Sequence, residues 1–153
     1  MKSIKELYGE KNQLNLKLVV ALSRTTSTLH RATQSELSPY NLTIAQFGVL
    51  EALYHLGDMK ICEIIDKTLS TSGNMTVVIN NLERDGLVSR FTSPEDRRVT
   101  KVQLTQKGEA IIAAFFPEHV KHLENQFAAL TESERQTLLK ILKKLNRLES
   151  SEE

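Results

Sequence analysis

The 153-residue sequence has one cysteine, no tryptophan, three prolines and six glycines. Because the single thiol of Cys62 has no partner for an internal disulfide, a disulfide-stabilised secreted scaffold is excluded and a reducing compartment is expected. Apolar runs such as residues 18–22 are far shorter than the ~20 residues needed to cross a bilayer. The first twelve residues are charged and lack the apolar stretch of a signal peptide. We therefore expect a cytoplasmic protein that has no membrane partner.

A strong excess of charge of one sign is also missing. The 20 Lys and Arg residues nearly balance the 19 Asp and Glu residues, which leaves a net charge of +1. A nucleic-acid site would therefore depend on basic residues that are concentrated locally. With 40% hydrophobic and 25% charged residues, the composition is that of one globular domain with a core of ordinary size.

The first half of the chain has the periodicity of helices. Apolar residues recur every three or four positions over residues 4–37, and Pro39 follows that stretch. Thr43 and Gln46 have the spacing of a capping box, which opens a short helix that ends near Gly57. We expect further helices over residues 59–68 and 73–85, the second of which ends at Gly86.

The second half changes period and then becomes helical again. Residues 87–91 and 99–104 alternate in the manner of strands around a polar turn, and they predict a two-stranded hairpin. A helix follows from Thr105 and is expected to bend or break at Pro117, and a capping box at Thr131 and Glu134 opens the last helix. The order predicts a mainly α fold with a small β-hairpin wing, that is, a winged helix-turn-helix.

The helix over residues 73–85 has the features of a DNA-recognition helix. At ~100° per residue, one side is apolar and would pack on the core through Met75, Val78, Ile79 and Leu82. The opposite side is small and rich in amides, which can pair with adenine, and a valine methyl can contact thymine in the major groove. A merely solvated face is the alternative, but Asn and Thr are mediocre helix formers. The candidate DNA-binding residues are Ser72, Asn74, Thr76, Val77, Asn80, Asn81 and Arg84.

The predicted hairpin turn adds a second candidate contact with DNA. Asp96 is followed by Arg97 and Arg98, so that the carboxylate can brace one guanidinium while the other faces phosphate or the minor groove. An Asp-Arg-Arg turn is common on protein surfaces and carries little information by itself. Its place directly after a candidate recognition helix makes these three residues candidates for DNA binding.

The segments LTIAQFGVLEAL, TSGNMTVVINNLERDGLVSR and SPEDRRVTKVQLTQKGEAI, in this order, resemble the MarR family of regulators. The resemblance covers residues 42–112. It implies that residues 73–85 are the recognition helix, that Arg98 contacts the minor groove and that Asp96 braces it. It also implies that residues 42–105 form a DNA-binding lobe, while residues 1–37 and 106–153 form the helical dimerisation region of one intertwined domain.

The resemblance implies a transcriptional regulator, expected to be a repressor. Leucine-rich stripes at residues 4–29 and 138–148 would pair between two subunits, since soluble proteins avoid leaving such stripes exposed. A two-fold dimer would present two recognition helices ~34–36 Å apart to a near-palindromic operator in double-stranded DNA. A small-molecule or redox signal would then release the DNA.

Four aromatic residues are candidates for an effector pocket. The resemblance implies a pocket for a small aromatic molecule between the dimerisation helices and the lobe. Aromatic side chains at helical spacing are nevertheless more often part of the core, and we favour that interpretation for each one alone. The four residues are Phe47, Tyr54, Phe115 and Phe116.

Redox and metal chemistry have weaker support. Cys62 could sense oxidants, but it lies among isoleucines and beside Glu63, whose charge disfavours a thiolate, so a quiet structural role is favoured. His119 and His122 lie three residues apart, and no further cysteine or carboxylate cluster completes a zinc site. We therefore expect no metal and no cofactor.

Two other classes of function compete with a DNA-binding regulator. A winged helix that binds proteins would carry a more apolar recognition face than Asn74, Thr76 and Asn80 provide. An enzyme would need a nucleophile, an acid/base pair or a phosphate-binding loop, and the sequence has no recognisable motif of that kind. We expect a protein that binds DNA and is not an enzyme.

Overall fold

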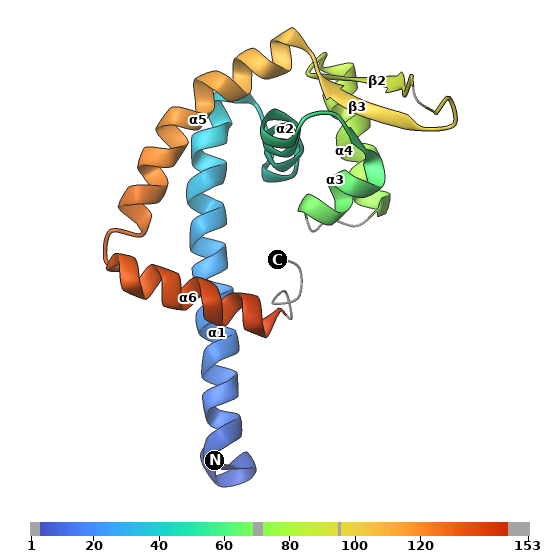
Figure 1. The fold of residues 1–153 in the computed structure, drawn as a ribbon. Helices are drawn as coiled ribbons and strands as arrows, with labels where there is room; N and C mark the ends of the chain where they lie inside the picture. The colour runs from blue at the N-terminus through green and yellow to red at the C-terminus, as the bar shows by residue number, and fades with distance from the viewer. Residues whose placement is uncertain (1–3, 69–71, 95, 147–153) are drawn as a thin grey trace. The chain divides into compact units, whose positions relative to one another are not determined.

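A computed structural model describes residues 4–68, 72–94 and 96–146, and their side chains except at positions 4–7, 72 and 73. The chain divides into two compact units, Met1–Phe116 and Pro117–Glu153. Within the described ranges, no helix combines the length and the hydrophobicity that a membrane span needs. The elements in chain order are α1 (Ile4–Leu37), η1 (Ser38–Tyr40), α2 (Ile44–Leu56), β1 (Met59–Lys60), α3 (Ile61–Thr68), α4 (Ser72–Arg84), β2 (Val88–Thr92), β3 (Thr100–Leu104), α5 (Gln106–Gln126) and α6 (Glu132–Leu145) (Figure 1).

The predicted mainly α fold with a small β wing is confirmed. Helix α1 has the predicted span of residues 4–37, although its backbone leaves helical geometry at Gly9, where φ is 82° and ψ is 167°. A residue without Cβ adopts such angles without steric cost, and the periodicity of apolar positions does not reveal this local interruption. Helix α4 also begins and ends within one residue of its predicted bounds.

Both predicted capping boxes are present. In α2, the Thr43 hydroxyl accepts a hydrogen bond from the Gln46 amide at 3.2 Å, and the Gln46 side chain accepts one from the Thr43 amide at 2.9 Å. In α6, Thr131 and Glu134 make the same reciprocal pair. Each box satisfies amides at the start of a helix that have no partner within the helix.

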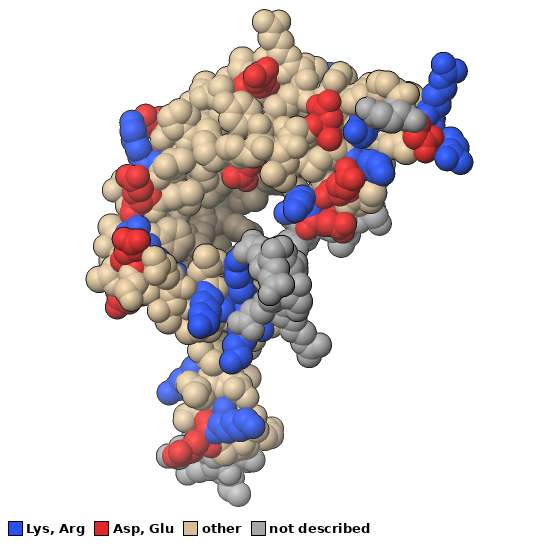
Figure 2. Space-filling view, in the orientation of Figure 1, with Lys and Arg blue, Asp and Glu red and all other residues tan. Residues whose placement is uncertain are grey.

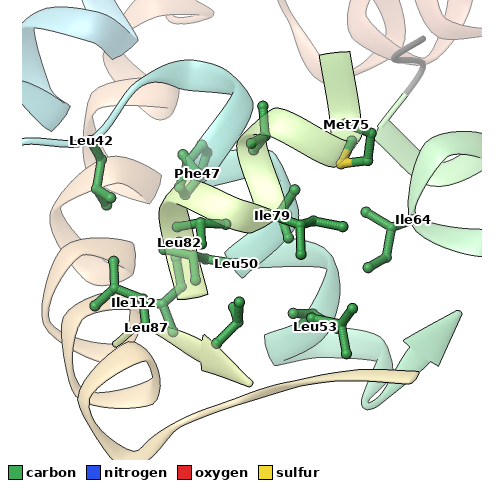
Figure 3. Packing of buried hydrophobic residues seen from close by; sticks show 14 of the residues in the cluster. Leu42, Phe47, Leu50, Leu53, Ile64, Met75, Ile79, Leu82, Leu87 and Ile112 are labelled. Atoms are coloured by element: carbon green, nitrogen blue, oxygen red, sulfur yellow. The ribbon is translucent and has the colours of Figure 1, made fainter. Parts of the chain in front are cut away.

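The hydrophobic core lies among α2, α3, α4, the sheet and the first part of α5 (Figure 3). The four residues predicted for the apolar side of the recognition helix all belong to this core, and each is at most 7% exposed. Their burial orients α4, because the opposite side of the helix is thereby turned to solvent. These four residues are Met75, Val78, Ile79 and Leu82.

The sheet has three strands in the order β1-β3-β2, whereas the sequence predicted a two-stranded hairpin. Met59 and Lys60 were expected to begin a helix, but they pair antiparallel with Val102 and Lys101 of β3. Met59 is 6% exposed, so its burial favours the extended pairing. Helix α3 starts at Ile61, two residues later than predicted, and the Glu63 carboxylate accepts a hydrogen bond from the Lys60 amide at 2.8 Å.

Of the two outcomes expected at Pro117, a bend or a break, the break is wrong, because α5 continues through this residue to Gln126. Proline removes one backbone hydrogen bond from a helix interior and crowds the preceding turn, which is costly but does not always end the helix. The long helical segments on both sides of Pro117 retain their own backbone hydrogen bonds. Local sequence rules do not weigh that contribution against the cost of the proline.

Candidate nucleic-acid interface

Helix α4 presents its polar side to solvent, as the sequence predicted. Asn81 is half-buried, and Val77 is 56% exposed although it is apolar. Ser72 is the first residue of α4, but its side chain lies outside the described residues. A helix with amides and a methyl group on its exposed side has the chemistry that the DNA major groove accepts. The exposed candidate residues on this side are Asn74, Thr76, Val77, Asn80 and Arg84.

The end of α4 is closed by a left-handed glycine. Gly86 has a φ of 71°, its amide donates to the Glu83 carbonyl at 3.0 Å, and the Leu87 amide donates to the Leu82 carbonyl at 2.9 Å. These two hydrogen bonds form a Schellman motif, in which the left-handed residue has little steric cost only if it is glycine. The chain therefore leaves α4 in a defined direction and enters β2 directly.

The start of α5 is bonded to this same turn. The Thr105 amide donates to the Leu87 carbonyl at 3.1 Å, and the Thr105 hydroxyl donates to the Gly86 carbonyl at 2.6 Å. Lys107 adds a hydrogen bond from its Nζ to the Asp85 carbonyl at 2.8 Å. A Cβ on Gly108 would lie only 2.0 Å from the Leu87 carbonyl oxygen. These contacts fix the recognition helix, the wing and the beginning of α5 relative to one another.

The wing is the hairpin of β2 and β3, and its turn is closed by backbone hydrogen bonds. The Ser93 amide donates to the Val99 carbonyl at 2.8 Å, and the Val99 amide donates to the Asp96 carbonyl at 2.9 Å. In the register of the strands, Phe91 lies opposite Lys101, and Thr92 lies opposite Thr100. Figure 2 shows Lys and Arg side chains gathered at the outer end of this hairpin.

Asp96 braces Arg98 at the wing tip, in the geometry that the sequence predicted. The guanidinium donates to the two carboxylate oxygens at 3.1 and 3.2 Å, and the Arg98 amide donates to Oδ1 of Asp96 at 3.0 Å. The Arg98 side chain is 91% exposed although it is held in this way. Arg97, beside it, is exposed as well. An arginine held in place at an exposed tip has already given up part of the conformational freedom that binding would otherwise remove.

The pKa of Asp96 lies below its ordinary value, mainly because the Arg98 side chain donates to the carboxylate and also because the Arg98 amide and the charge of Lys60 favour the anion. Because the pKa is lowered, Asp96 is ionised and the ion pair is complete at any pH above the ordinary pKa range of aspartate. The ion pair is lost only as the pH falls through the lowered pKa. The brace is therefore intact at neutral pH. Lys60 reaches this neighbourhood through the pairing of β1 with β3, which the sequence reasoning missed.

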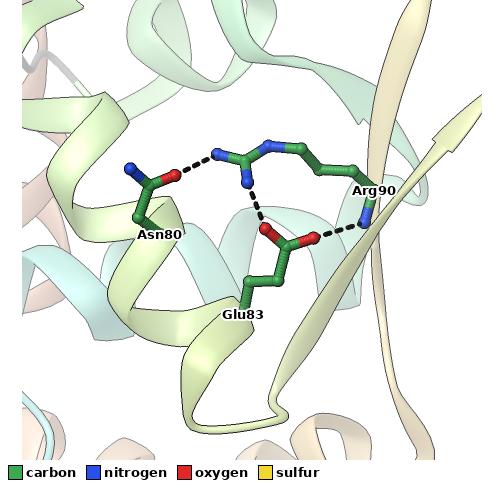
Figure 4. A network of polar contacts seen from close by, with 3 residues as sticks. All are labelled: Asn80, Glu83 and Arg90. Atoms are coloured by element: carbon green, nitrogen blue, oxygen red, sulfur yellow. Dashed lines mark hydrogen bonds and ion pairs between the residues drawn. The ribbon is translucent and has the colours of Figure 1, made fainter.

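A second group of polar contacts joins the wing to the recognition helix (Figure 4). Arg90 of β2 forms an ion pair with Glu83, and its backbone amide donates to the same carboxylate at 3.2 Å. Nη2 of Arg90 also donates to Oδ1 of Asn80 at 2.6 Å. Nothing in the sequence singles out Arg90. Its partners lie seven and ten positions earlier across a turn, and no helix or strand periodicity relates such positions.

The four candidate effector residues fall into two places. Phe47 and Phe115 are buried in the core, where their rings meet edge to face with centroids 5.0 Å apart. The rings of Tyr54 and Phe116 each contact His55, with centroids at 5.2 and 4.7 Å. Phe47 and Phe115 thus have the core role that we favoured for each aromatic residue alone. The assignment of these four residues to an effector pocket stays a prediction.

The candidate redox and metal residues do not come together in a described site. Cys62 is a free and exposed cysteine on α3, so its thiol has no packing role in the core. His119 is buried and His122 is exposed on the same helix. Across the described ranges, His, Cys, Asp and Glu side chains form no group of three that could hold a metal ion.

Alkylation of Cys62 with iodoacetamide is expected to proceed in the folded protein, since the thiol is exposed. We expect DNA affinity to stay unchanged, because exposure alone does not make a thiol a sensor. Mass spectrometry after labelling and a DNA titration of the labelled protein measure both effects. Loss of DNA binding on labelling would contradict this expectation and show that modification of Cys62 is coupled to DNA binding.

Comparisons with known proteins agree with this geometry. The profile of the MarR family matches residues 42–100. The HTH-type transcriptional regulator MhqR of Bacillus subtilis is 36% identical over 131 residues, which cover 86% of this chain and 90% of that protein. A mutant of E. coli MarR complexed with operator DNA has a TM-score of 0.79 and 25% identity, with 95% of this chain and 99% of that chain covered.

A second solved structure concerns control by a small molecule. Bordetella bronchiseptica BpsR, whose DNA binding is regulated by 6-hydroxynicotinic acid, has a TM-score of 0.76 and 26% identity. The similarity covers 85% of this chain and 98% of that chain. It therefore extends well beyond the winged helix-turn-helix into the flanking helices.

Proposed function

This chain belongs to the MarR family of DNA-binding transcriptional regulators, and from that premise we propose that it is a homodimeric repressor of a near-palindromic operator. Residues 42–105 act as the DNA-binding lobe, and residues 1–37 and 106–153 act as the dimerisation region. The protein blocks access to a promoter in the cytoplasm by binding double-stranded DNA, and it catalyses no reaction.

The proposal is carried by the exposed polar side of α4 together with Arg98 at the wing tip. In this proposal α4 enters the major groove, where Asn74, Asn81 and Val77 face base edges. The amides at the start of α4, and Ser72 with them, approach a phosphate. Arg98 enters the minor groove, where the negative potential attracts a guanidinium.

Exposed apolar side chains on α1 and α6 support the proposed dimer. Leu14, Leu18 and Val19 of α1 are each more than half exposed, and so are Leu139, Ile141 and Leu145 of α6. A mainly apolar hollow of about 390 Å³ on α1 is lined by Gln13, Leu16, Lys17, Val20, Ala21 and Arg24. A soluble monomer does not usually expose such surfaces, whereas a two-fold dimer buries them in one self-complementary interface.

A small aromatic molecule is the proposed signal for release. In this proposal the dimer has two arrangements, and in one of them the two recognition helices cannot reach the same duplex. A ligand that binds this arrangement more tightly increases its population and thereby lowers DNA affinity. The regulation of BpsR by 6-hydroxynicotinic acid supports a signal of this class. Tyr54 and Phe116 are the proposed contacts of the effector, and Phe47 and Phe115 stay candidates from within the core.

A titration of the DNA upstream of the protein's own gene tests the proposal. We expect a discrete complex of two protomers per duplex, which electrophoretic mobility shift and sedimentation would measure, and footprints one helical turn apart on the two half-sites. A monomer in solution, or equal affinity for all sequences, contradicts it. A winged helix that binds only proteins would leave the DNA unshifted.

A further inference from the structure

We propose that Arg90 is a positioning residue that holds the amide of Asn80 of the recognition helix in one orientation and weakens its oxygen as an acceptor for a base. Asn80 then favours a base edge that offers acceptors over the paired contact with adenine that a free asparagine makes. This inference rests on the proposed function, because it concerns how the same α4 surface reads DNA.

The guanidinium of Arg90 is held firmly before it meets Asn80. Arg90 sits in β2 opposite Val102, and its side chain is only 26% exposed. One oxygen of the Glu83 carboxylate accepts from the Arg90 amide and the other pairs with Nη1, so that the same carboxylate holds both ends of the residue. The other terminal nitrogen, Nη2, points at Oδ1 of Asn80 at 2.6 Å.

This contact determines which way the Asn80 amide faces. Arginine carries only donors, so the group turned toward it must be the amide oxygen and not the amide nitrogen. Figure 4 shows Oδ1 directed at Arg90 and Nδ2 on the other side of the amide. Asn80 is exposed, and Nδ2 has no hydrogen-bond partner among the residues that the structure describes. The group that Asn80 offers to DNA is therefore an N–H donor.

An amide held in this way has a changed base preference. A free asparagine pairs with adenine by donating to N7 and accepting from N6. The Arg90 guanidinium takes one of the two lone pairs of Oδ1, and its positive charge makes the oxygen a weaker acceptor for the adenine N6 amine, so that the advantage of adenine over guanine shrinks. Guanine offers two acceptors, N7 and O6, to Nδ2, whereas cytosine presents a donor. We expect one position in each half-site at which guanine is accepted at least as well as adenine and cytosine is disfavoured.

The ion pair also neutralises an acid on the DNA-facing helix. Without Arg90, the Glu83 carboxylate would be an unpaired negative charge one turn after Asn80, and it would repel phosphates whatever the sequence. A substitution of Arg90 alone would mix this repulsion with the effect on the amide. The double variant Glu83→Gln, Arg90→Gln removes both charges, so the net charge stays the same while the amide of Asn80 is released from the guanidinium.

The test is enrichment of a random double-stranded DNA library by the full-length wild-type protein, the double variant and Asn80→Ala. Wild type is expected to select a position with guanine at least as frequent as adenine. In the double variant, adenine should rise over guanine at that position by roughly fivefold or more, because the amide regains its paired contact. Asn80→Ala should lose base preference there and keep the rest of the profile, which locates the position that Asn80 reads.

A role of Arg90 in stability alone would lower the melting temperature of the double variant and leave its base preference unchanged, and that outcome overturns the inference. If the double variant does not fold, Arg90→Lys replaces it, since lysine keeps the charge beside Glu83 but lacks the fork that also reaches Asn80. The same shift toward adenine is expected, and an unchanged profile again overturns the inference. A wild-type protein that enriches no sequence overturns the proposed function itself.

Discussion

Replacement of Arg98 by alanine is expected to lower operator affinity at least about 30-fold, because the two arginines of a dimer each contribute of the order of 1–3 kcal/mol to binding. The slope of log affinity against log salt concentration should also fall in magnitude, by roughly one for each cationic side chain that no longer reaches the duplex. The 91% exposure of Arg98 means that its removal costs the folded protein little. Fluorescence anisotropy of a labelled operator at several salt concentrations measures both quantities.

Two further variants test whether DNA affinity depends on the position of the positive charge or only on the total charge. Lys121→Ala removes one positive charge at an exposed position of α5, far along the chain from the wing, and should leave affinity nearly unchanged. Asp96→Asn keeps the size of the side chain but removes the ion pair that braces Arg98, so that affinity should fall by less than in Arg98→Ala. Equal losses in Lys121→Ala and Arg98→Ala would show that only total charge matters and would contradict the wing assignment.

Replacement of Gly108 by alanine is expected to destabilise the protein by about 3 kcal/mol or more, which is beyond the usual range for one substitution. The added Cβ would lie 2.0 Å from the Leu87 carbonyl oxygen and 3.0 Å from the carbonyl carbon. Both atoms are backbone, so no side-chain rotation relieves the overlap, and α5 or the turn after α4 must move. Urea denaturation at fixed protein concentration measures the change in the free energy of unfolding.

Gly48 provides the matched control in another helix. A Cβ on Gly48 would meet Cγ2 of Thr68 at 3.6 Å, which is an ordinary contact, and Gly48 lies inside α2. Gly48→Ala should therefore raise the free energy of unfolding by up to about 1 kcal/mol, because alanine favours helical geometry. If both variants changed stability with the same sign and size, the close approach at Gly108 would not be what makes glycine necessary there.

The recognition helix shows how far local reasoning reaches into the candidate site. The apolar and polar sides of α4 follow from a repeat of 3.6 residues, so that the burial of Met75 and Leu82 and the exposure of Asn74 were predictable from spacing alone. The brace between Asp96 and Arg98 was predictable as well, because the two residues are held close together in one tight turn and carry opposite charges. The roles of these residues on DNA stay predictions that the variants above address.

The wing's connection to α4 was not predictable in the same way. Arg90 meets Asn80 and Glu83 only after the Schellman turn at Gly86 has reversed the chain and laid β2 beside the helix. The contact bears on the chemistry assigned to Asn80, since Oδ1, which would accept from adenine, already accepts a hydrogen bond from Arg90. The exposure of an amide on α4 therefore does not show by itself that both of its polar groups are available to DNA.

The sequence by itself determined the helices, their capping boxes, the hairpin and the outward side of α4, because each depends on interactions between residues a few positions apart. Only the tertiary structure decided that Met59–Lys60 pairs with β3, that α5 continues through Pro117, and that Arg90 holds Asn80. These outcomes depend on burial and on partners brought together by folding. Their stability depends on contacts between residues that are distant in the chain, and a local periodicity does not predict such contacts.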